Sequence, residues 1–235
     1  QSWLDNYRKT HSSREYEREV LARYVSDISC VFPNHVIHDC VSDDIEFASP
    51  DVFIGAQYAA FDAENSVIAE NYYRDGISNI RIYVIPQEGR RIMEAENYIV
   101  DLVNKHGASR VIINNTSLGS APIESMAALI GEDMVIGVSN HETKAEIEGQ
   151  RNRYIKEDLY VNLLKLMERR LVRFDDPRIQ SAMMDVRYDY SKRTKTIWII
   201  GNDIMDAIVR AIFPIWGRRE WLGWEKPQIS FKKYK

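Results

Sequence analysis

The chain has 235 residues, of which 45% are hydrophobic and 28% are charged, so it can bury one large core or two small ones. Its formal net charge of -4 argues against a surface covered with nucleic-acid-binding charge, although a local basic face is compatible with it. Cys30 and Cys40 lack the CxxC spacing of a zinc or redox site, and we expect reduced, partly buried thiols. Since we find no apolar run of about 18 residues and no signal-peptide pattern at the start, we expect a soluble protein without a membrane span.

The first fifty residues are expected to lead into the main domain. A helix is predicted up to about residue 28, because apolar side chains recur there at helical spacing, at Tyr16, Val20, Leu21 and Tyr24. The stretch from Ser26 to Pro50 is predicted to be irregular, since Pro33 and the acidic run at 42–44 interrupt any long element.

Strands are predicted next, at 51–61, 66–74 and 79–86. The residues DAEN at 62–65 are turn formers, so the first two strands form a hairpin and the third completes a meander. Three consecutive strands without an intervening helix indicate an antiparallel arrangement.

The rest of the chain alternates helix and strand. The predicted elements are an amphipathic helix at 91–106 capped by Gly107, a short apolar strand at 109–115, a helix within 117–131, a strand at 133–140, a long charged helix from about Thr143 to Arg170, a strand LVRF at 171–174, a helix after Pro177, a hairpin across 191–195, and a closing helix at 202–214. An antiparallel meander followed by this alternation predicts an α/β fold with a mixed sheet and helices on its faces. The order is that of an RNase H-like fold.

Five segments carry a resemblance that extends over nearly the whole chain. They are REYEREVLARY at 14–24 with VFPNHVI at 31–37, FIGAQ at 53–57, VIINNTSLGSAPIESM at 111–126, KEDLYVNLLKLMERRLVRF at 156–174, and GNDIMDAIVRAI at 201–212. In this order and at this spacing they resemble the C-terminal nuclease domain of the large terminase subunit, the motor protein that packages DNA in tailed viruses.

The resemblance implies a domain layout and a set of partners. Residues 1–50 would be a lead-in helix and linker from an upstream ATPase motor domain, 51–213 the RNase H-like nuclease domain, and 214–235 a basic and aromatic tail. An opening Gln1 rather than Met fits a piece of a longer polypeptide. The implied partners are double-stranded DNA, the portal and the small terminase subunit, and the implied location is the host cytoplasm.

Three amides stand where the family carries metal-binding acids: Gln57, Asn114 and Asn202. The family cuts DNA by two-metal hydrolysis, in which carboxylates hold Mg²⁺ or Mn²⁺. An amide oxygen can bind such an ion but brings no charge, so we expect metal to bind poorly and cleavage to be weak or absent. Natural loss of the acids explains Gln57 better than a deliberate exchange does, because Gln is longer than the Asp it would replace.

An active endonuclease is the alternative, and it would need other acids. Asp203 and Asp206 are three residues apart and share one face of the closing helix, while Asp62 and Glu64 lie at the first hairpin. Together they are candidate metal ligands, with the amides as neutral ligands. The plainer interpretation is a helix-dipole contact for Asp203 and turn chemistry for Asp62 and Glu64. Another RNase H-like nuclease, such as a junction resolvase, is a further alternative, against which the lead-in at 14–37 argues.

DNA contact is predicted from basic groups. The hairpin tip carries Lys192, Arg193 and Lys195 without an acid among them, which suits phosphate contacts. Lys156 lies on the long charged helix, where neighbouring acids favour an ordinary solvated face.

Overall fold

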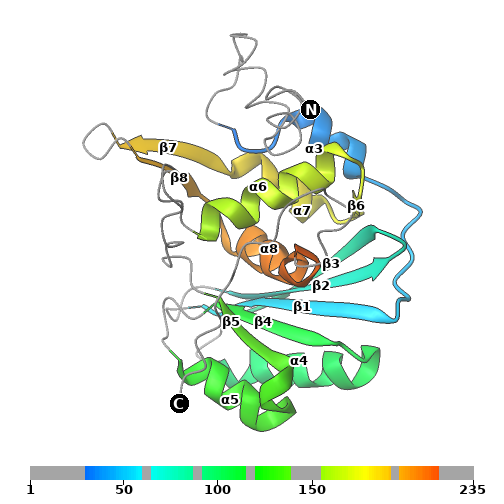
Figure 1. The fold of residues 1–235 in the computed structure, drawn as a ribbon, viewed down its shortest axis with the longest axis vertical. Coiled ribbons are helices and arrows are strands. Elements are labelled where there is room, and N and C mark those ends of the chain that lie inside the picture. The colour runs from blue at the N-terminus through cyan, green and yellow to red at the C-terminus, as the bar shows by residue number, and fades with distance from the viewer. Residues whose placement is uncertain are drawn as a thin grey trace, which may run out of the picture.

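A mixed sheet between two layers of helices makes up the fold (Figure 1). This computed structural model describes residues 30–59, 65–86, 92–114, 120–138, 155–191 and 196–216. Within these ranges, no helix combines the length and the hydrophobicity needed to cross a lipid bilayer.

The central sheet has six strands in the order β5-β4-β1-β2-β3-β6. The strands are β1 (Asp51–Gln57), β2 (Ser66–Arg74), β3 (Ile77–Ile85), β4 (Arg110–Asn114), β5 (Val135–Val138) and β6 (Val172–Arg173). β1, β2 and β3 form an antiparallel meander, whereas β4 runs parallel to β1, β5 to β4 and β6 to β3. The predicted meander and the mixed RNase H-like α/β sheet are confirmed.

Helices cover both faces of this sheet (Figure 1). One face carries α3 (Asn34–Cys40), α6 (Ile155–Glu168), α7 (Pro177–Asp185) and α8 (Asp203–Trp216), and the other carries α4 (Ile92–His106), α5 (Ala121–Ile130) and the short 3-10 turn η1 (Glu132–Met134). Alternation along β1 sends Phe53 into the core under α8, and Val52 and Ile54 into the core under α4. The long predicted helix corresponds to α6, and residues 139–154 before it lie outside the described part.

A separate two-stranded ribbon pairs β7 (Arg187–Ser191) with β8 (Thr196–Ile200) in antiparallel fashion. It confirms the predicted hairpin, whose tip at 192–195 lies outside the described residues. β8 leads through Gly201 and Asn202 directly into α8.

The segment predicted to be irregular contains a helix, α3. Pro33 precedes the first turn, where its fixed φ of -65° is compatible with a helix start, so it does not break the element as we expected. Val36, Ile37 and Cys40 of α3 are buried in the same core as α6 and α8. Burial raises the pKa of the Cys40 thiol to about 12, and Cys30 is likewise buried and free.

α8 lies unusually close to β1 at Gly55. A Cβ atom on this glycine would stand 2.1 Å from the Ala207 carbonyl oxygen and 2.4 Å from the Ala211 nitrogen. Both are backbone atoms of α8, which cannot move aside as a flexible side chain could. A second tie lies next to it, since the Asn71 amide on β2 donates to the Ala211 carbonyl at 3.2 Å. Gly55 therefore sets the separation between the helix and the sheet.

We expect Gly55→Ala to lower the free energy of unfolding by about 3 kcal/mol, because the added methyl forces α8 away from β1. Gly76→Ala is the matched control: a Cβ there meets nothing within 4 Å, and its φ of +85° costs about 1 kcal/mol by backbone strain alone. Urea unfolding of both variants followed by circular dichroism measures the difference. Equal losses would contradict the close approach.

Candidate functional site: the ends of β1 and β4 and the start of α8

Two of the three amides contact each other. Gln57 is the last residue of β1 and Asn114 the last of β4, and these parallel strands are neighbours, so their carboxyl ends meet at one edge. The Asn114 Nδ2 donates a hydrogen bond to the Gln57 Oε1 at 2.9 Å, and Asn114 is buried. The amide oxygen of Gln57 thus already accepts a proton donor of the protein.

The third amide, Asn202, caps α8. Its Oδ1 accepts the Met205 N–H at 3.0 Å, which satisfies a backbone donor that the first turn leaves open. Its Nδ2 donates to the Ala182 carbonyl oxygen on α7 at 2.9 Å. Both ends of this amide therefore hold the helix start in place.

The start of α8 points toward the end of β1 that carries Gln57. Asn71, which contacts Ala211, is paired with Phe53, while Gly55 meets the backbone from Ala207 to Ala211. Going back along α8 from Ala211 toward its first residue therefore follows β1 from Phe53 toward Gln57. The predicted candidates on β1, β4 and α8 lie toward the same edge of the sheet.

Asp206, a candidate ligand in the sequence, is bound by two groups of α6. The Tyr160 hydroxyl donates to its Oδ1 at 2.6 Å, and the Lys156 ammonium lies 3.5 Å from the same oxygen. Burial, followed by the charge of Asp206, raises the pKa of Tyr160 well above its ordinary value, so the hydroxyl remains a donor. Gly201 makes room for this contact, because a Cβ there would stand 2.0 Å from the Tyr160 hydroxyl.

Arg210 completes the charge balance from one turn further along α8. It is fully buried, and its guanidinium donates to the Asp206 carbonyl oxygen. Burial lowers the pKa of Arg210, while the charges of Asp206 and Asp203 act in the opposite direction. The carboxylates of α8 thus lie among cations supplied by the protein itself.

The described residues do not fit a two-ion centre. No group of three or more His, Cys, Asp or Glu side chains that could hold a metal ion occurs among the residues placed by the structure. Gln57, Asn114 and Asn202 contribute no charge, and the Asp206 Oδ1 already binds Tyr160 and Lys156. Asp62 and Glu64, and the basic tip residues Lys192, Arg193 and Lys195, lie outside the described ranges.

Comparison with known proteins finds its matches among solved structures. No protein-family model matches the sequence, and neither does any curated protein. The large terminase nuclease of thermophilic phage G20c is similar over 79% of this chain and 98% of its own, with a TM-score of 0.59 and 17% identity. The large terminase of a second thermophilic bacteriophage is similar over 91% of this chain and 52% of its own, with a TM-score of 0.63 and 11% identity. The nuclease domain of the large terminase subunit of bacterial virus Sf6 is similar over 78% of this chain and 98% of its own, with a TM-score of 0.60 and 12% identity.

The chain has the fold of a large-terminase nuclease domain. At these identities the likeness is one of fold, and the sequence-based resemblance is confirmed at that level. One structure of the G20c domain, with a TM-score of 0.60 to this chain, was solved with bound magnesium. The terminase-nuclease fold thus places Gln57, Asn114 and the start of α8 at one sheet edge here, with amides at three of its polar positions.

A second polar cluster of this terminase-nuclease fold lies on the opposite face of the sheet and was not predicted. Glu70 of β2 is fully buried and accepts hydrogen bonds from the Tyr72 and Tyr83 hydroxyls, both at 2.8 Å. The His106 Nδ1 at the end of α4 lies 2.7 Å from its other oxygen. Period-two patterning predicts that Glu70 shares a face with Ile68 and Tyr72, but only the fold brings His106 to it. We assign this cluster a structural role, since it joins α4 to the sheet and each named group has a partner.

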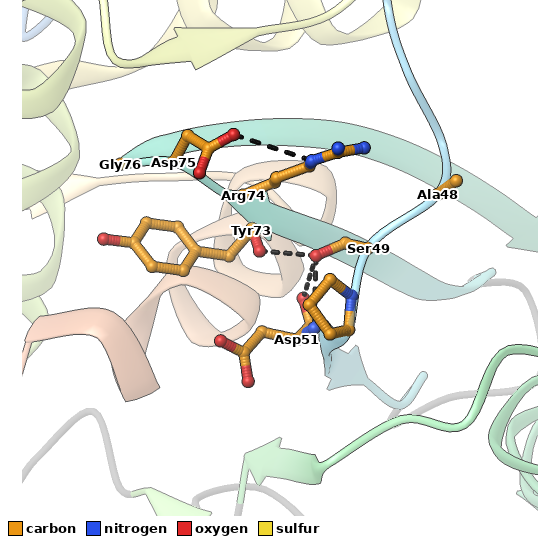
Figure 2. A pocket seen from close by; sticks show the side chains of 8 residues that line it. Ala48, Ser49, Asp51, Tyr73, Arg74, Asp75 and Gly76 are labelled. Atoms are coloured by element: carbon orange, nitrogen blue, oxygen red, sulfur yellow. Dashed lines mark hydrogen bonds and ion pairs between the residues drawn. The ribbon is translucent and has the colours of Figure 1, made fainter.

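A surface hollow of about 720 Å³ lies at the other end of β1 (Figure 2). Its lining comes from the segment before β1 and the turn between β2 and β3, namely Ala48, Ser49, Pro50, Asp51, Tyr73, Arg74, Asp75 and Gly76. The Arg74 guanidinium is bound by Glu46 at 2.7 Å and lies 3.6 Å from Asp75. Because Asp51 begins β1 and Gln57 ends it, the hollow is separate from the amide site.

We expect Asn202→Ala to lower the free energy of unfolding by about 2 kcal/mol, because the cap of α8 and the bond to α7 are lost together. Asn202→Ser keeps a capping oxygen and removes only the bond to Ala182, so it should cost about 1 kcal/mol. Thermal unfolding of the two variants and the unaltered chain measures both steps. If serine and alanine were equally disruptive, Asn202 would not act as a cap.

Proposed function

We propose that this chain is the nuclease-like domain of a large terminase, that it acts in viral DNA packaging, and that it cleaves DNA weakly or not at all. The observation that carries the proposal is the hydrogen bond between Asn114 and Gln57. Neutral side chains in contact at this edge provide neither the charge nor the open oxygens that would draw Mg²⁺ or Mn²⁺ from water. With Asn202 used as a cap, the three positions stabilise the fold instead.

In this role the domain binds and guides double-stranded DNA, and the cut is made elsewhere. The basic tip at Lys192, Arg193 and Lys195 supplies phosphate contacts. The portal, the small terminase subunit and an ATPase domain earlier in the same polypeptide are the proposed partners, in the host cytoplasm. The large terminase of the second thermophilic bacteriophage supports the last of these, since this chain spans about half its length, 52%.

A metal-dependent endonuclease is the second candidate. It is favoured by the position of Asp203 and Asp206 in the first turn of α8, at the edge where the strands end. Asp62 and Glu64 would have to contribute further carboxylates. Any Mg²⁺ or Mn²⁺ would bind weakly with the amides as neutral ligands, because carboxylate charge is what brings hard cations to a protein site.

A plasmid-nicking assay separates the two candidates. We expect the unaltered chain to leave supercoiled plasmid intact in Mn²⁺, at the level of an EDTA control, and Asp203→Ala to behave identically. The restored variant Gln57→Asp/Asn114→Asp/Asn202→Asp is the matched test of missing charge, and nicking by it at least about 10-fold above the unaltered chain is expected from the weight of metal-site ligands. Nicking by the unaltered chain that disappears in Asp203→Ala would establish the endonuclease instead.

DNA binding is tested by the salt dependence of affinity. Lys192→Ala/Arg193→Ala should weaken binding to duplexes of any sequence and reduce the slope of log K against log salt by about 2, since two phosphate contacts are lost. Lys105→Ala/Arg110→Ala removes the same charges from an exposed region near α4 and β4 and should leave the slope unchanged. Fluorescence anisotropy with a labelled duplex measures both. An equal effect of the two double variants would place the DNA elsewhere.

A further inference from the structure

Four side chains from two helices form a compact charged cluster. Lys156 and Tyr160 lie one turn apart on α6, and Asp206 and Arg210 lie one turn apart on α8. Both α6 side chains meet at one atom, the Asp206 Oδ1, at 2.6 Å from the Tyr160 hydroxyl and 3.5 Å from the Lys156 ammonium. The ammonium also lies 5.6 Å from the centre of the Tyr160 ring. The cluster joins α6 to the start of α8.

The cluster is largely withdrawn from water. Asp206 is 7% exposed, Tyr160 and Arg210 are fully buried, and the Lys156 side chain is 21% exposed. A buried carboxylate is tolerated only when a cation and hydrogen-bond donors compensate its lost hydration. Arg210 donates to the main-chain carbonyl of Asp206, whereas Lys156 and Tyr160 contact the carboxylate itself.

The contacts made by Lys156 occupy the oxygen that a metal ion would need. A hard cation binds through carboxylate lone pairs and is drawn in by net negative charge. Here the lone pairs of Oδ1 face a hydroxyl and an ammonium, and a divalent ion at this oxygen would meet a like charge about one ligand distance away. Lysine is suited to this place because its charge is compact and sits at the end of a flexible stem.

We propose that Lys156 is a built-in counter-ion of the site, whose ammonium gives Asp206 the positive charge that a bound divalent cation would supply and thereby keeps metal away. Lys156 acts through Asp206, so it is a positioning residue and not a catalytic one. The inference rests on the proposed function, because it explains how a terminase-nuclease fold without its acids keeps a buried carboxylate at its site. It also gives Lys156 a role other than the DNA contact expected from the sequence.

The test is Mn²⁺ binding to the purified chain without DNA, followed by the electron paramagnetic resonance of free Mn²⁺. Lys156→Met removes the ammonium and keeps the stem, while Lys156→Arg keeps a positive charge. We expect Lys156→Met to bind one Mn²⁺ at least about 10-fold more tightly than the unaltered chain, the weight of a single metal-site change, and Lys156→Arg to bind no better than it. Lys156→Met/Asp206→Asn should lose the gain.

The same titration can overturn the proposal. An ion bound by the unaltered chain and lost in Asp206→Asn would do so, and so would a folded Lys156→Met that gains no affinity. If Lys156→Met does not fold, Lys156→Gln, which is also neutral but can still donate to Asp206, is measured in its place. Should both unfold, recovery of folding by Mn²⁺ supports the proposal and failure to recover contradicts it.

Failure here and failure of the proposed function give different results. Cleavage is read on plasmid, whereas the counter-ion is read as metal affinity without DNA. A chain that does not nick plasmid but binds Mn²⁺ regardless of the charge at Lys156 sinks only the counter-ion. A chain that nicks plasmid through Asp203 overturns the proposed function whatever Lys156 does.

Discussion

The close approach of α8 to β1 at Gly55 is the constraint on which the rest of the site depends. Helix backbone stands where a side chain of any other residue would begin, so the helix can lie almost against the strand. The hydrogen bond from Asn71 to Ala211 fixes its direction. With the helix held there, its first turn lies toward the edge where β1 and β4 end, and the amides and acids of three distant segments come to one place.

The chemistry of that place is balanced from within the protein. Gln57 and Asn114 satisfy each other, Asn202 holds the start of α8, and the Asp206 carboxylate is bound by a hydroxyl and an ammonium. A two-metal nuclease needs the opposite arrangement, with uncompensated carboxylates that gain from a divalent ion. Such internal pairing is costly to break once formed, because removal of one partner leaves a buried charge alone.

Sequence reasoning was most reliable where the signal is local. The strands β1, β2 and β4 and the helices α4 and α8 were predicted because apolar residues repeat at the period of the element. The positions of Gln57 and Asn114 at strand ends followed from the same patterns. The miss was α3, where Pro33 was taken as a breaker although it stands just before a helical turn, a position that proline tolerates.

By itself, the sequence determined which residues stand at the ends of β1 and β4 and before α8, and that these are amides rather than acids. Only the tertiary structure decided what those residues bind. The contact of Lys156 with Asp206 and that of His106 with Glu70 each join separate elements that lie far apart along the chain. A sequence pattern records the period of one element, whereas contacts between elements depend on their separation and direction, which here are set where α8 meets Gly55.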